Sequence, residues 1–215
     1  MTCSRCKKEG HNRATCSIDV SAEVVLVTND IAHVLPADTI QDIELPSDVR
    51  MKLRELAAMC SDVAAALGKG NPESVYQHAL CIELRAHGIS YGFEVTMPVM
   101  YKGHAIPYNT YRLDIILYDY LPFIFELKAT SGRIKTSEHW QLVRYMEQQK
   151  KQYGMVVNYA QSHSGQLEMN FIIYHEGKYK LYDLKTGKAR VLADYGYADD
   201  VSNYLSDSES CNGEE

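Results

Sequence analysis

The sequence has neither a long hydrophobic run nor an N-terminal leader pattern. No segment reaches about eighteen consecutive apolar residues, the length that a membrane-spanning helix needs. A signal peptide has a basic flank followed by an apolar core. The first residues instead include Cys3 and Lys7 and no apolar core, so we expect no signal peptide. These absences predict no membrane partner and an intracellular, reducing compartment, and they do not separate nucleus from cytoplasm.

Basic residues are absent from the end of the chain. Residues 191–215 contain seven Asp and Glu and no Lys or Arg, whereas the whole chain has 22 basic and 28 acidic residues. Residues 1–190 therefore hold 22 basic and 21 acidic residues, so the net charge of −6 does not exclude a nucleic-acid partner. We expect residues 193–215 to form a disordered acidic tail; the alternative is a tail that competes with a polyanion or recruits a basic protein partner.

The order of hydrophobic patterns predicts an α/β domain with a central mixed sheet flanked by helices. Helices are expected at 46–67, at 72–87 after an Asn71 cap and before Gly88, and at 137–151. Strands are expected at 91–101, 110–118, 123–129, 154–160, 168–176 and 178–184, with no internal repeat. We divide the chain into a metal-binding segment (1–16), a linker (17–46), the α/β domain (47–192) and the tail (193–215).

Three charges interrupt the apolar stretch "RLDIILYDYLPFIFELKA" at 112–129. A turn centred on Tyr120 would place Asp114 opposite Glu126 on one face, with Cβ atoms about 4.5–5.5 Å apart. Like charges repel there, whereas a shared hard cation such as Mg²⁺ would hold both carboxylates. Lys128 follows on the same face and could orient a water. The alternative is a salt bridge, in which Lys128 pairs with one carboxylate and leaves the other uncompensated.

This spacing resembles the signature of PD-(D/E)XK nucleases: Asp114, eleven residues, then "ELK" at 126–128. "GNPESVY" at 70–76 looks like the GxxExxY element of one family of that superfamily, and "QLVRY" at 141–145 is similar to the QxxxY helix motif of RecB-like and related exonucleases. The resemblance covers roughly residues 50–160. It implies a restriction-endonuclease-like fold and a metal-dependent nuclease acting on phosphodiester bonds of DNA or RNA.

The resemblance also implies residue roles around a catalytic Mg²⁺ or Mn²⁺. Asp114, Glu126 and the Leu127 carbonyl would bind the ion, and Glu73 would add a carboxylate close to it. Lys128 would orient the attacking water. For Glu73, the simpler interpretation is an acidic residue that favours the positive end of a helix dipole.

Two tyrosines and a glutamine complete the implied site. Gln141 and Tyr145 lie four residues apart on a predicted helix, face the same way and would position the scissile strand. Tyr76 and Tyr145 could border a groove for nucleic acid. The simpler interpretation places Gln141 on the helix surface and Tyr145 at the edge of the core. A nuclease-like module that binds nucleic acid or protein without cutting is the alternative function.

The N-terminal cluster has the spacing C-x2-C-x4-H-x4-C. Three thiolates and one imidazole form a closed tetrahedral shell for structural Zn²⁺, with ligands Cys3, Cys6, His11 and Cys16. The pattern resembles the CCHC zinc knuckle. Basic residues suited to phosphate contacts surround the ligands, namely Arg5, Lys7, Lys8 and Arg13. The segment has no aromatic residue for base stacking, so a knuckle that binds a protein partner is the alternative.

Overall fold

A computed structural model describes residues 40–162 and 165–192. Over these residues the chain forms an eight-stranded mixed sheet, in the order β1-β8-β7-β6-β5-β4-β3-β2, with three helices. This confirms the α/β architecture and is consistent with the expected nuclease-like fold. The predicted knuckle, most of the linker and the acidic tail lie outside the described residues.

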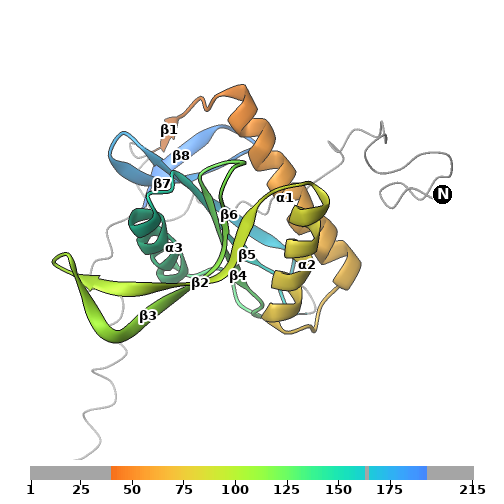
Figure 1. Ribbon diagram of the computed structural model, residues 1–215. Helices are drawn as coiled ribbons and strands as arrows, with labels where there is room; N and C mark the ends of the chain where they lie inside the picture. Colours follow the sequence, from red (N-terminus) through yellow and green to blue (C-terminus); the bar gives the residue numbers. More distant parts are fainter. Residues whose placement is uncertain (1–39, 163–164, 193–215) are drawn as a thin grey trace, which may run out of the picture.

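The helices cover both faces of the sheet (Figure 1). Helices α1 (Ser47–Leu67) and α2 (Glu73–Ala86) pack together on one face, and α3 (Thr136–Gln149) lies on the other. Each helix buries an apolar stripe against the sheet, as the 3.6-residue period predicts. In the described parts of the chain, no helix is long and apolar enough to cross a membrane.

Strand direction follows from the connections. The strands are β1 (Ile40–Asp42), β2 (Tyr91–Tyr101), β3 (His104–Leu117), β4 (Phe123–Lys128), β5 (Tyr153–Asn158), β6 (Glu168–His175), β7 (Lys178–Tyr182) and β8 (Lys188–Val191). Among these eight described strands, only β4 and β5 pair in parallel, because α3 returns the chain between them; the other neighbouring strands are antiparallel.

Strand β4 divides the core by its period of two. Phe123, Phe125 and Leu127 pack in the cluster beneath α1 and α2, whereas Ile124 packs in the cluster beneath α3. The residues two and four positions after Ile124, Glu126 and Lys128, therefore lie on the α3 face. The buried strand thus carries the charges of the predicted site to the side covered by α3.

Three details differ from the predictions. Strand β1 lies in the segment assigned to the linker, pairs with the unpredicted β8, and is followed by buried Ile43 and Leu45. Strand β3 begins six residues earlier than expected. Asn71 does not cap α2: its Nδ2 donates to the carbonyl of Leu67 (3.1 Å) and so satisfies one of the free carbonyls at the end of α1.

Candidate functional site

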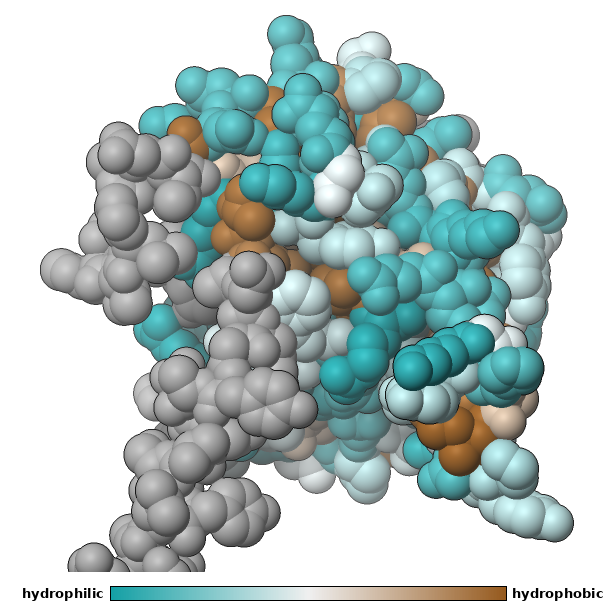
Figure 2. Space-filling view, turned by 90° about the vertical axis from the view of Figure 1, so that its left-hand side faces the viewer, coloured by the Kyte–Doolittle hydropathy of each residue, from teal (hydrophilic) through white to brown (hydrophobic). Residues whose placement is uncertain are grey.

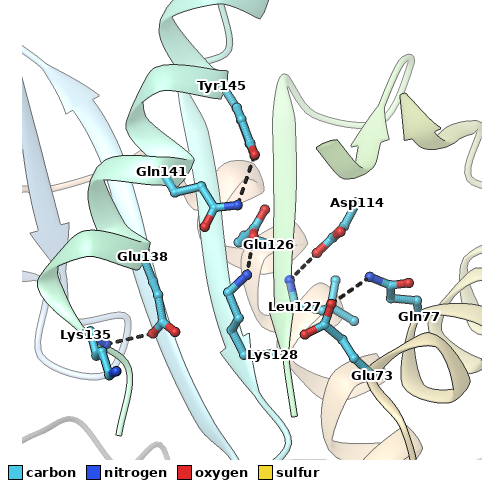
Figure 3. A network of polar contacts seen from close by, with 10 residues as sticks. All are labelled: Glu73, Gln77, Asp114, Glu126, Leu127, Lys128, Lys135, Glu138, Gln141 and Tyr145. Atoms are coloured by element: carbon cyan, nitrogen blue, oxygen red, sulfur yellow. Dashed lines mark hydrogen bonds and ion pairs between the residues drawn. The ribbon is translucent and has the colours of Figure 1, made fainter. Parts of the chain in front are cut away.

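Strands β3 and β4 meet in the predicted register. Ile115 pairs with Phe125 and Ile116 with Ile124, so both pairs are centred on Tyr120. The ladder ends at Ile115, and the next residue, Asp114, uses its side chain in place of the backbone. The Leu127 N–H donates to Asp114 Oδ2 at 2.7 Å. This bond fixes the Asp114 carboxylate against the strand that carries Glu126 and Lys128 (Figure 3).

The Asp114 and Glu126 carboxylates of this site are buried, and they outnumber its single lysine. Asp114 is 6% and Glu126 1% exposed. Lys128 Nζ lies 2.5 Å from Glu126 Oε1, so the ion pair joins Lys128 to Glu126 and not to Asp114. The second oxygen, Glu126 Oε2, is buried without a hydrogen-bond partner. One lysine therefore compensates only part of the carboxylate charge.

The titration behaviour reflects this imbalance. The pKa of Glu126 is raised to about 8, first by burial and then by the Asp114 carboxylate, while the Lys128 ammonium opposes both. Burial also raises the pKa of Asp114, against the Leu127 N–H and Lys128. Burial acts to lower the pKa of Lys128, yet Glu126 and the other carboxylates together raise it, so Lys128 stays protonated at neutral pH.

Glu73 joins this cluster from the first turn of α2. Burial raises the pKa of Glu73, Lys128 opposes the rise, and the Asp114 charge adds to it. Gln77, one helical turn later and buried, donates to Glu73 Oε1 (3.3 Å), and its amide acts against the rise in the pKa of Asp114 that burial causes. Glu73 is thus both a first-turn acid and a neighbour of the site. Gln77 was not predicted, although its i+4 spacing from Glu73 places both on one face.

Gln141 and Tyr145 lie on the face of α3 that covers Glu126 (Figure 3). Gln141 Nε2 donates to Tyr145 Oη at 3.0 Å, as the spacing of the motif predicts. The Tyr145 side chain is buried, and its ring contacts Tyr111 with centroids 5.8 Å apart. Burial raises the pKa of Tyr145; the Gln141 hydrogen bond opposes the rise and the Glu126 carboxylate adds to it.

Comparison with protein families now identifies the domain. The family model of the PD-(D/E)XK nuclease superfamily matches residues 51–170, which are 120 of the 215 residues. The chain belongs to the PD-(D/E)XK nuclease superfamily. The match runs from within α1 to the first residues of β6 and contains Glu73, Asp114, Glu126, Lys128 and the Gln141–Tyr145 pair. No curated protein and no solved structure matches the chain.

In this superfamily domain Tyr76 is a core residue, which corrects its predicted place at a groove. Its side chain is 0% exposed, stacks on Tyr159 with centroids 4.4 Å apart, and donates a hydrogen bond to the Gly68 carbonyl (2.8 Å). The preceding loop is held by Gly70, whose φ of +89° suits glycine and whose N–H donates to Gln161 Oε1 (2.6 Å). Gly70 and Tyr76 therefore fix the loop and α2, and Glu73 between them reaches the carboxylate cluster.

Proposed function

We propose that this chain is a nuclease of the GxxExxY family that hydrolyses phosphodiester bonds in DNA or RNA with Mg²⁺ or Mn²⁺ bound at Asp114 and Glu126. The observation that carries the proposal is the partnerless Glu126 Oε2, buried in a cluster where carboxylates outnumber the single lysine. A buried charge left uncompensated costs several kcal/mol, and a bound cation offsets that cost.

The donor chemistry fits a hard divalent ion. Across residues 40–162 and 165–192, no three His, Cys, Asp or Glu lie close enough to form a complete ligand cluster. Mg²⁺ does not need one, since it commonly uses one or two carboxylates and retains several waters. Asp114 and Glu126, with the Leu127 carbonyl, supply such a partial shell. Glu73 would approach through a water or a side-chain rotation.

The chain's own residues divide the work of hydrolysis. A bound Mg²⁺ or Mn²⁺ would lower the pKa of a coordinated water and offset negative charge on the phosphate. The Lys128 ammonium, whose side chain is 18% exposed, would hold the nucleophilic water and face the charge that develops on the phosphate oxygens. Gln77 would keep the carboxylates of Glu73 and Asp114 in place.

The α3 pair would act on the substrate strand. Gln141 retains its carbonyl oxygen after donating to Tyr145, and the Tyr145 hydroxyl retains its proton for donation. Together they offer one acceptor and one donor beside Glu126, which suits the positioning of a sugar and a phosphate. The raised pKa of Tyr145 keeps its hydroxyl neutral under working conditions.

We further propose that residues 1–16 are a CCHC knuckle with one structural Zn²⁺, joined by the linker to the nuclease domain. Its four basic residues, Arg5, Lys7, Lys8 and Arg13, would contact phosphates and so raise the local concentration of nucleic acid at the domain. The acidic tail after residue 192 completes the proposed organisation.

The direct test is cleavage by the full chain. Single-stranded DNA, duplex DNA and single-stranded RNA are incubated with Mg²⁺ or Mn²⁺, with and without chelator. We expect metal-dependent cleavage that Lys128→Ala and Asp114→Asn abolish, while Lys178→Ala, an exposed lysine on β7, retains it. If folded wild type cleaves none of these substrates with either metal, the nuclease proposal is wrong and the binding module replaces it.

A further inference from the structure

The outer parts of β2 and β3, residues 98–112, form a two-stranded arm. Strand β3 pairs with β4 only at Ile115 and Ile116, and β2 is the last strand of the sheet, so the described residues of the arm form backbone pairs only between β2 and β3. Figure 1 shows the arm projecting beyond the sheet. Asp114 follows the arm by two residues, so the arm leads directly to the candidate site.

The arm exposes large apolar side chains. Of the ten large hydrophobic residues exposed in the described parts of the chain, four lie in the arm within the nine positions 100–108, namely Met100, Tyr101, Ile106 and Tyr108. Tyr108 is 104% exposed. An isolated two-stranded ribbon gains little from burial, so these residues do not stabilise the fold.

A bulge produces the exposure of Tyr108. Pro98 pairs with Thr110 and Met100 with Ala105, so residues 106–109 of β3 lie opposite the single residue Val99. The backbone at Tyr108 has a φ of +62°, the left-handed region that tyrosine rarely adopts. Bulges of this kind change the direction of a side chain and are frequent next to active sites. The left-handed backbone at Tyr108 is unfavourable, and its exposed ring makes no buried contact that would compensate within the fold.

The charge of the arm suits a polyanion. Residues 95–113 contain no Asp or Glu in a chain whose net charge is −6. Lys102 Nζ lies 5.4 Å from the centroid of the Tyr101 ring. Arg112 pairs with Glu94 (3.4 Å) and precedes Asp114 by two residues on β3, so it lies where the arm meets the carboxylates. Exposed rings beside cations are the two elements of a single-strand binding surface.

We propose that the arm binds single-stranded nucleic acid, with Tyr101 and Tyr108 stacking on bases and Lys102 and Arg112 contacting phosphates. The inference rests on the proposed function, because the bound strand would continue from the arm to Asp114. Only unpaired bases offer a face to a tyrosine ring, which favours single strands over duplex.

A protein partner fits this surface less well. Figure 2 views the molecule from the side on which the arm projects in Figure 1. Among the coloured residues on that face, hydrophilic ones predominate and hydrophobic ones form small separate groups. Protein-docking surfaces present larger continuous apolar areas.

Binding without divalent ions tests the arm separately from cleavage. The full chain is titrated into short fluorescent oligonucleotides of mixed sequence: single-stranded DNA, single-stranded RNA and duplex DNA. We expect Tyr108→Ala to weaken single-strand binding about 5- to 150-fold, the loss of one stacked base, while Tyr108→Phe retains the affinity. Lys102→Ala should reduce the salt slope by about 0.7. The matched control is Tyr174→Ala, which removes an exposed tyrosine of β6 and should leave binding unchanged.

The outcomes separate the two proposals. If wild type cleaves nucleic acid but Tyr108→Ala binds single strands as tightly as wild type, the arm inference is wrong and the nuclease proposal stands. If Tyr108 is needed for binding but cleavage never occurs, the arm inference stands and the nuclease proposal fails. If Tyr108→Ala dissociates a dimer in sedimentation without changing single-strand binding, the arm is a self-association surface and the inference is overturned.

Discussion

The excess of carboxylates predicts that the metal-free protein loses stability as the pH rises above neutrality. The pKa of Glu126 is raised from 4.5 to about 8 in the folded state. The folded protein therefore binds this proton more tightly than the unfolded chain, and the stability it confers disappears as the pH rises through that window. His139 has the opposite sign, because burial lowers its pKa from 6.5 to about 4. As the pH rises toward 6.5, the stability lost through Glu126 is opposed by the stability gained through His139. Above pH 6.5 only the loss of stability through Glu126 remains of these two.

The expected magnitude follows from the window. One pKa unit corresponds to about 1.4 kcal/mol, so from pH 6.5 to pH 8 the free energy of unfolding should fall by at most about 2 kcal/mol. Glu126→Gln removes the titrating group but keeps its size. The stability of this variant relative to wild type should therefore increase across the same interval, by up to about 2 kcal/mol.

Urea unfolding at several pH values without divalent ions measures this difference. Glu44→Gln, which neutralises an exposed glutamate, serves as the control and should follow wild type at every pH. Mg²⁺ should reduce the loss in wild type but not in Glu126→Gln, because bound metal replaces the proton. Parallel curves for wild type and Glu126→Gln between pH 6.5 and pH 8 would refute the reasoning.

Three further predictions concern single groups. Asp114→Asn should leave the metal-free protein equally stable or more stable by about 0.2–1 kcal/mol in denaturant unfolding. The substitution relieves the repulsion with Glu126, and the amide oxygen can still accept the Leu127 N–H. A loss of about 3–5 kcal/mol would instead indicate a salt bridge between Asp114 and Lys128. Elemental analysis should find one zinc per full chain and none after deletion of residues 1–16, with circular dichroism showing that the α/β domain remains folded. Tyr76→Ala should lower the free energy of unfolding by about 3–5 kcal/mol, whereas Tyr174→Ala should cost much less.

The centre of the site was predictable because local rules fix it. The alternation of β4 and the turn at Tyr120 set the register that brings Asp114 close to Glu126. The bounds of β2 were predicted exactly, since its apolar pattern is long and ends at Lys102 and Gly103. The i+4 spacing of Gln141 and Tyr145 likewise predicted a contact that the helix enforces.

Depth and long-range pairing were not predictable. Spacing places Tyr76 on a helix, but only the packing of α2 on Tyr159 shows that its ring is inside. Strands β1 and β8 are three and four residues long and stabilise each other across the sequence, so neither has a strong pattern of its own. The strand was expected to begin at residue 110, but a bulge accommodates Pro107 and Asn109 within β3, which begins at His104. That Glu126 Oε2 is buried without a hydrogen-bond partner follows from the packing of all the elements around it, which no local sequence pattern reveals.

The bond from the Gly70 N–H to Gln161, together with the stacking of Tyr76 on Tyr159, gives the GxxExxY element two kinds of position. Gly70 and Tyr76 hold the loop and α2 in place, whereas Glu73 lies close to the carboxylates of the candidate site. A related chain that keeps the first and last residues of the element but replaces the middle one would therefore retain the fold while losing a carboxylate from the site. Among related sequences, the glycine and tyrosine positions would therefore report on this packing, whereas the residue equivalent to Glu73 would report on the number of carboxylates close to Asp114 and Glu126.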